Sequence, residues 1–193
     1  MSATLERGFK SWAERTAASL RADLSLSTRE PLDPRRLAEY LEVRLITPSE
    51  IPGIPQEVLK QLLNVDPWGW SAVTIMQGDA ALIIYNPRHS LGRQASDIAH
   101  ELAHILLGHD AAKLIMSADG QLVMRTYDQK QEDEANWLAW ALLLPRDALL
   151  HNRRMKATVE QIAERYGVTE TLVQFRMRVT GVEAQVRARK HSG

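Results

Sequence analysis

The 193-residue sequence contains no cysteine, and this absence excludes three kinds of chemistry. Without thiols the chain forms no disulfide, builds no thiolate metal site and has no cysteine nucleophile. Any metal site must therefore use histidine and carboxylate ligands, which are typical of catalytic rather than structural zinc. A chain without cysteine also fits a reducing compartment.

Long apolar stretches are also missing. The first ten residues are polar and mixed, without the apolar segment of a secretory signal. The longest apolar run, Trp137 to Leu144, is far shorter than the ~20 residues that a membrane-spanning helix needs. Because the hydrophobic content of 45% and the charged content of 25% are ordinary for globular proteins, we expect a cytoplasmic protein without a membrane partner.

The chain carries no net charge, but its charges are unevenly distributed. Residues 1–150 contain 15 Lys and Arg against 20 Asp and Glu, a net of −5, whereas residues 151–193 contain 9 against 4, a net of +5. A basic C-terminal segment raises the question of a nucleic-acid or acidic partner. The simpler interpretation, which we favour, is a solvated helical face followed by a basic tail.

Hydrophobic periodicity predicts both strands and helices. Residues 68–76 and 80–85 are rich in strand-forming side chains and flank Gly78-Asp79, which predicts a hairpin with its turn there. Helical spacing predicts further elements at residues 4–25, 34–41, 56–63, 128–144 and in a pair over 158–180. Together these elements predict an α+β fold.

The sequence His100-Glu-Leu-Ala-His104 lies in a run that reads as a helix, with Ser90 as N-cap and Gly108 as its C-terminal stop. At about 100° per residue, two histidines four positions apart lie on the same face. Two such imidazoles can bind one Zn²⁺, and a glutamate beside the first can act as general base. We therefore predict His100 and His104 as zinc ligands and Glu101 as the base.

A catalytic zinc site needs a third protein ligand. His109 lies at the wrong spacing for the HExxHxxGxxH pattern, and its place at a helix end favours an interaction with the last carbonyls. Glu132 and Asn136 are four positions apart and share one face of the helix expected over 128–144. We predict Glu132 as the third ligand and Asn136 as a hydrogen-bond partner of a ligating histidine or a carbonyl.

Other acidic residues stay open as the third ligand. Glu134 lies about 200° around the helix from Glu132, so both cannot face the metal, and Glu134 is the next candidate. Asp133 is a lesser candidate, and nothing distinguishes Asp110 or Asp119. The acids at 132–134 also fit an acidic first turn that complements the helix dipole.

These residues together resemble the ImmA/IrrE-type zinc metallopeptidases, which are bacterial and phage cytoplasmic proteins often found beside repressors. The matching segments are Trp70-Ser-Ala72, Ile84-Tyr-Asn-Pro87, His100 to His109, Glu132-Asp-Glu-Ala-Asn136 and Leu142-Leu-Leu-Pro145. The resemblance implies a zincin-like domain with Zn²⁺ held by His100, His104 and Glu132, and with Glu101 as general base. It also implies a metalloendopeptidase whose protein substrate is a partner repressor.

Residues 158–178 carry a second signal. Thr158 and Thr169 are expected to cap two helices joined at Gly167, as in a DNA-binding helix–turn–helix. The second helix would present several side chains for contact with DNA: Glu170, Thr171, Gln174, Arg176 and Arg178. Glu170 is a poor neighbour for phosphate, and nothing else in the chain suits a DNA groove, so we favour a helical hairpin packed on the peptidase domain. The alternative function is a non-proteolytic regulator that binds DNA or a repressor.

The expected organisation has three parts. A zincin-like metallopeptidase domain with a small antiparallel sheet and the HExxH helix spans 1–150, a helical hairpin spans 151–185, and a flexible basic tail spans 186–193. Within the first part, strand 80–85 is a candidate to pair with an extended substrate, although its apolar run suits an interior strand equally. Tyr127 and His109 are candidates for stabilising the oxyanion, and neither is favoured.

Overall fold

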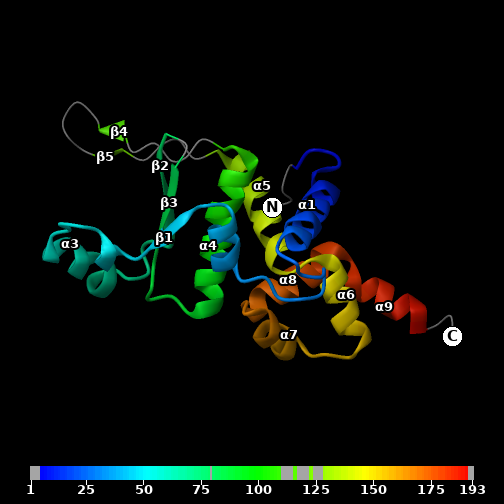
Figure 1. Ribbon diagram of the computed structural model, residues 1–193. Coiled ribbons are helices and arrows are strands. Elements are labelled where there is room, and N and C mark those ends of the chain that lie inside the picture. Colours follow the sequence, from blue (N-terminus) through cyan, green and yellow to red (C-terminus); the bar gives the residue numbers. More distant parts are fainter. Residues whose placement is uncertain (1–4, 79, 110–114, 117–121, 124–127, 191–193) are drawn as a thin grey trace.

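Two helices, α4 (Leu91–Leu107) and α5 (Gln129–Leu143), pack along each other at the centre of the molecule. Figure 1 shows them between a small sheet with α3 on one side and helices α1 and α6 to α9 on the other. This computed structural model describes residues 5–78, 80–109, 115–116, 122–123 and 128–190. The fold is mixed α+β and mostly helical, as the sequence predicts.

The remaining elements complete the order along the chain. They are α1 (Phe9–Asp23), α2 (Pro34–Tyr40), β1 (Arg44–Ile46), the 3₁₀ turn η1 (Pro48–Glu50), α3 (Gln56–Lys60), the π turn η2 (Gln61–Val65), β2 (Ala72–Gln77), β3 (Ala80–Tyr85), β4 (Ile115–Met116), β5 (Leu122–Val123), α6 (Arg146–Arg154), α7 (Val159–Tyr166), α8 (Glu170–Thr180) and α9 (Val182–Lys190). Among the described residues, none of these helices has both the length and the apolarity that crossing a bilayer requires.

The main sheet has the order β1-β3-β2, with β3 in the centre. β2 and β3 pair antiparallel as the predicted hairpin, whose turn residue Asp79 lies outside the described residues. β1 pairs parallel to β3, so the expectation of a purely antiparallel sheet is wrong. Residues 47–71 lead from the end of β1 to the start of β2 at the same end of the sheet, and β2 then returns the chain so that β3 runs parallel to β1. Because β3 is paired on both sides, the hypothesis that a substrate strand pairs with it is also wrong.

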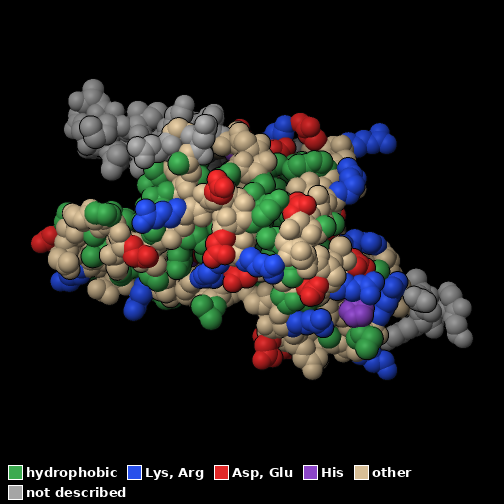
Figure 2. All heavy atoms as spheres, in the orientation of Figure 1, with side chains coloured by type: hydrophobic (Ala, Val, Ile, Leu, Met, Phe, Trp, Pro, Cys, Tyr) green, Lys and Arg blue, Asp and Glu red, His purple; other side chains and the backbone are tan. Residues whose placement is uncertain are grey.

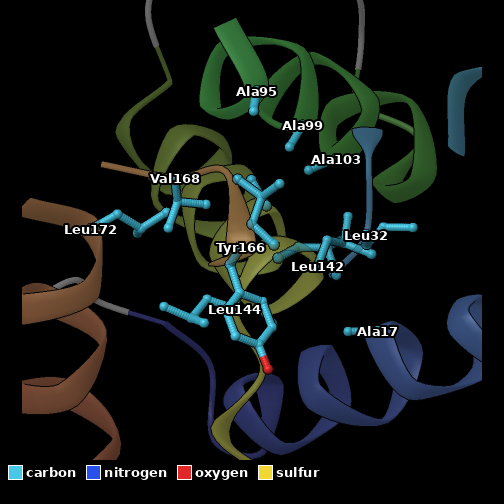
Figure 3. Packing of buried hydrophobic residues seen from close by; sticks show 14 of the residues in the cluster. Ala17, Leu32, Ala95, Ala99, Ala103, Leu142, Leu144, Tyr166, Val168 and Leu172 are labelled. Carbon is cyan, nitrogen blue, oxygen red and sulfur yellow. The ribbon is translucent and has the colours of Figure 1, made fainter. Parts of the chain in front are cut away.

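Helix α4 begins and ends where its capping residues predict. The Ser90 hydroxyl accepts a hydrogen bond from the Arg93 N–H at 3.4 Å, and Gly108 ends the helix in the left-handed region at φ 63°. Small side chains line the face of α4 that packs on the core, and Figure 3 shows Ala95, Ala99 and Ala103 directed into it. Small residues allow neighbouring helices to approach α4 closely. The polar side chains of α4 consequently lie beside α5.

The C-terminal helices pack against this central pair. An added Cβ at Gly92 would lie 3.0 Å from the Val168 carbonyl carbon, so the first turn of α4 abuts the connection between α7 and α8. Arg176 of α8 is fully buried, and its Nε donates to the Leu144 carbonyl oxygen at 3.0 Å. The expectation that Arg176 faces solvent is therefore wrong. Residues 186–190, expected in a flexible tail, lie in α9.

Candidate metal centre

Three donor atoms converge between α4 and α5. The Nε2 atoms of His100 and His104 lie 3.0 Å apart. The carboxylate of Glu132 places Oε2 3.2 Å from His100 Nε2 and Oε1 3.5 Å from His104 Nε2. In the part of the chain that the structure describes, these three residues form the one group of His, Cys, Asp and Glu side chains arranged to hold a metal ion.

The spacing of these donors fits a tetrahedral metal ion. Metal–ligand bonds of 2.0–2.1 Å at tetrahedral angles separate neighbouring donor atoms by about 3.3 Å. The observed separations run from 3.0 to 3.5 Å. Two imidazole nitrogens and a carboxylate oxygen also form the donor set of catalytic zinc sites, so the residues present fit a divalent cation such as Zn²⁺.

The protonation of the group is set by burial and by its internal charges. Burial and, after it, the neighbouring His100 lower the pKa of His104 to about 4, so the ring is neutral at pH 7. Burial also lowers the pKa of His100, but the hydrogen bond with Glu132 and the charges of Glu101 and Glu132 outweigh it and raise that pKa overall. The same hydrogen bond lowers the pKa of Glu132, which keeps the carboxylate ionised. A neutral imidazole and an ionised carboxylate are the forms that bind metal.

Glu101 lies beside the three donors without joining them. Its carboxylate accepts a hydrogen bond from the Thr74 hydroxyl of β2 at 2.5 Å. Burial raises the pKa of Glu101, and the bond from Thr74 opposes that shift. A carboxylate with a raised pKa is better matched to general-base work near neutral pH, and Thr74 holds it in one orientation.

A pocket of about 360 Å³ opens onto this cluster. Its lining comes from the start of β2, from α4 and from α5, and consists of Ser71, Ala72, Ser96, Asp97, His100, Glu101, Glu132, Asn136 and Trp140. Two of the donors, His100 and Glu132, therefore share with Glu101 one pocket that a side chain or a short peptide segment can enter.

The other residues singled out from the sequence lie around this cluster. Asn136 lines the pocket with His100 and helps to raise the pKa of that ring, whereas Asp133 accepts a hydrogen bond from Gln129 Nε2 at 2.9 Å. Glu134 lies 3.3 Å from His109 Nε2 and is not among the three donors. The candidates Asp110, Asp119 and Tyr127 lie outside the described residues.

Thr74 is the site residue that the sequence did not predict. It is 5% exposed and sits between the apolar side chains of Val73 and Ile75. A hydroxyl on the inward face of a strand needs a buried hydrogen-bond partner. This requirement is the one sequence signal that could have indicated Thr74. Its partner is separated from it by 27 positions in the chain, so sequence spacing alone did not reveal the contact.

Comparison with known proteins identifies a family and similar solved structures. The profile of the IrrE N-terminal-like domain, Peptidase M78, matches residues 62–178, which is more than half of the chain. No curated protein matches. Among solved structures, a Mycobacterium tuberculosis transcriptional regulator is similar, with a TM-score of 0.53 and 18% identity over 90% of this chain and 47% of that one. The chain thus spans about half the length of that regulator, and at this identity the likeness shows the fold alone.

Proposed function

The chain belongs to the Peptidase M78 family of IrrE N-terminal-like domains, the ImmA/IrrE family, and we propose that it is a zinc metalloendopeptidase that cleaves a partner transcription regulator. The observation that carries the proposal is the convergence of His100, His104 and Glu132 within 3.0 to 3.5 Å of one another. In this proposal residues 1–150 form a zincin-like metallopeptidase domain, and the helices of residues 151–185 pack on it.

The polar residues in and around the donor cluster have distinct roles in this proposal. His100, His104 and Glu132 would hold Zn²⁺, which when bound would supply Lewis-acid chemistry at the scissile carbonyl and at the attacking water. Glu101 accepts the proton of the attacking water and delivers it to the leaving amine. Thr74 orients the Glu101 carboxylate through its hydrogen bond, and Asn136 orients the His100 ring.

The peptide is expected to lie along β2 rather than β3. β2 is an edge strand of the three-stranded sheet, so one side of its backbone is available within the described residues. Ser71 and Ala72, at the start of this strand, line the pocket beside His100. An extended peptide added to that edge would pass the metal ligands and the Glu101 carboxylate.

A role based on DNA binding finds less support. Arg176, one of the arginines expected on the second helix of the pair, is buried and pairs with Glu14. On the face seen in Figure 2, acidic and basic side chains are interspersed over the C-terminal helices. A mixed surface of this kind lacks the continuous positive potential that attracts the phosphate backbone.

The test combines metal analysis with a cleavage assay. The full chain is purified, its metal content is measured, and it is incubated with the transcription regulator encoded beside its gene. We expect one Zn²⁺ per chain, and fragments of the regulator that disappear with a chelator and return with added Zn²⁺.

Glu132→Gln is the test variant and Asp133→Asn is its matched control, because each removes one negative charge from the first turns of α5. Glu132→Gln should lose stoichiometric zinc and cleavage, whereas Asp133→Asn should keep both. Wild-type protein without stoichiometric zinc, or cleavage that continues after chelation, would overturn the proposal.

A further inference from the structure

Two mostly buried residues that the proposed reaction does not use, His109 and Glu134, lie behind the ligand His104. Nδ1 of His109 lies 3.0 Å from Nδ1 of His104, and Nε2 of His109 lies 3.3 Å from Oε2 of Glu134. The side chains of His109 and Glu134 are 8% and 14% exposed. They connect α5 to the side of the His104 ring that faces away from Glu132.

Gly108 brings His109 back under the helix. Its φ of 63° lies in the left-handed region that glycine adopts without strain, and the His109 N–H donates to the His104 carbonyl oxygen at 3.0 Å. The imidazole of His109 is thereby folded against the His104 ring, with ring centroids 5.0 Å apart. The short contact between the two rings follows from how this helix ends.

The contacts allow one consistent placement of protons on neutral rings. The metal-facing atom of His104 is Nε2, so its single N–H must be on Nδ1. That N–H donates to His109 Nδ1, which must then be an acceptor. The proton of His109 is therefore on Nε2, where it donates to the Glu134 carboxylate. A proton on His109 Nδ1 would force the proton of His104 onto Nε2, the atom that binds metal.

We propose that Glu134 and His109 form a positioning relay that keeps the Nε2 lone pair of His104 directed at the metal ion. The inference rests on the proposed metal centre. A carboxylate suits the end of the relay because it only accepts hydrogen bonds, so it selects the Nε2–H form of His109. Partners of this kind typically change metal affinity about 10–100-fold when they are removed.

The sharpest test is Glu134→Gln in the full chain. The amide keeps the shape of the side chain but can donate an N–H to His109 Nε2, which permits the wrong tautomer of both rings. Asp133→Asn is the matched control, because it removes the same charge one position away. Zinc affinity is measured by competition with a chromophoric chelator, and we expect it to weaken about 10–100-fold in Glu134→Gln and to stay unchanged in Asp133→Asn.

A second readout reports the tautomer directly. Long-range ¹H–¹⁵N spectra of the metal-free protein should place the His104 proton on Nδ1 in the wild type and on both nitrogens in Glu134→Gln. Glu134→Asp, which still only accepts, should restore part of the affinity. If Glu134→Gln is unfolded by circular dichroism, His109→Ala replaces it, with the same expected loss of affinity.

The outcomes separate the relay from the metal centre. A wild-type protein that binds no zinc would overturn the proposed function itself. A wild type that binds zinc, with a folded variant that binds as tightly and keeps the wild-type tautomer, would overturn the relay alone.

Discussion

The two ends of helix α5 differ in polarity and in burial. Residues 129–136, the site end, carry Glu132, Glu134 and Asn136, all partly exposed and turned toward histidines of α4 or its C-terminus. Residues 137–143, the anchor end, are almost entirely buried, with Leu138 and Leu142 at 0% exposure. The polar side chains of the site end therefore lie close to the histidines. Apolar packing of the anchor end, one to two turns further along α5, fixes the helix in place.

The anchor end is also secured at its carbonyl groups. The last carbonyls of a helix lack partners within it, and burial would leave them without water. Arg21 of α1 donates to the Leu142 carbonyl oxygen, and Arg176 of α8 donates to that of Leu144. Burial lowers the pKa of Arg21 to about 10, which leaves it charged at neutral pH and suited to the negative end of the helix dipole. These two arginines fix the anchor end of α5 against α1 and α8.

The largest effect, on the rate of cleavage, is expected at Glu101 of α4, which lies opposite the site end of α5. Glu101→Gln removes the base but leaves the three donors in place, so the rate of cleavage should fall about 10²–10⁴-fold. Zinc content, measured on the same sample, should stay at the wild-type level. A variant that retains zinc and cleaves within a few-fold of the wild type would show that Glu101 is not the base.

At the anchor end, Leu142→Ala should act on stability alone. Truncation of a fully buried leucine leaves a cavity, and the free energy of unfolding should fall by about 2–5 kcal/mol. Urea unfolding of the metal-free protein measures this loss, and chelator competition on the folded variant should give the wild-type zinc affinity. An affinity more than tenfold weaker would mean that the two ends of α5 are coupled.

Thr74→Val tests the site end from the sheet. Valine has the shape of threonine but cannot donate to Glu101, and a hydrogen bond to a charged group contributes about 1.5–3 kcal/mol. We expect cleavage to slow by about tenfold or more, with zinc affinity unchanged. Thr171→Val, at an exposed position of α8, is the control that should change neither quantity.

The smallest effect is expected at Asp128, the N-cap residue directly before the site end. The Asp128 carboxylate caps α5 by accepting from the Lys130 N–H at 2.9 Å. Asp128→Ala should lower the free energy of unfolding by about 1 kcal/mol, less than Leu142→Ala. A larger loss than that of Leu142→Ala, measured by the same urea titration, would reverse the assignment of stability to the anchor end.

Local patterns predicted much of the centre of the molecule. Ser90 and Gly108 predicted the ends of α4, because capping depends on the residue itself and its nearest neighbours. Helical periodicity predicted that His100 and His104 share a face and that Glu132 and Glu134 point in different directions. The distances agree with both expectations, since Glu132 lies near the two histidines and Glu134 lies near His109.

Contacts between distant segments were beyond these patterns. The parallel pairing of β1 depends on the path of residues 47–71, and the burial of Arg176 depends on where α5 ends in space. An arginine on an amphipathic helix usually reads as exposed, and Arg176 is buried because the Leu144 carbonyl and the Glu14 carboxylate are its partners. Hydrophobic periodicity and composition therefore predict neither the parallel pairing of β1 nor the burial of Arg176.

The sequence by itself determined the chemistry available to this protein. It has no thiolate ligands, and it has two histidines and a glutamate on a helix with the spacing that one metal ion requires. The tertiary structure decided which other groups complete that chemistry: Glu132 from α5, Thr74 from β2, and the relay through His109 and Glu134. The reason is physical, because helical spacing follows from backbone geometry over four residues, whereas a hydrogen bond between two elements depends on how the whole core packs them together.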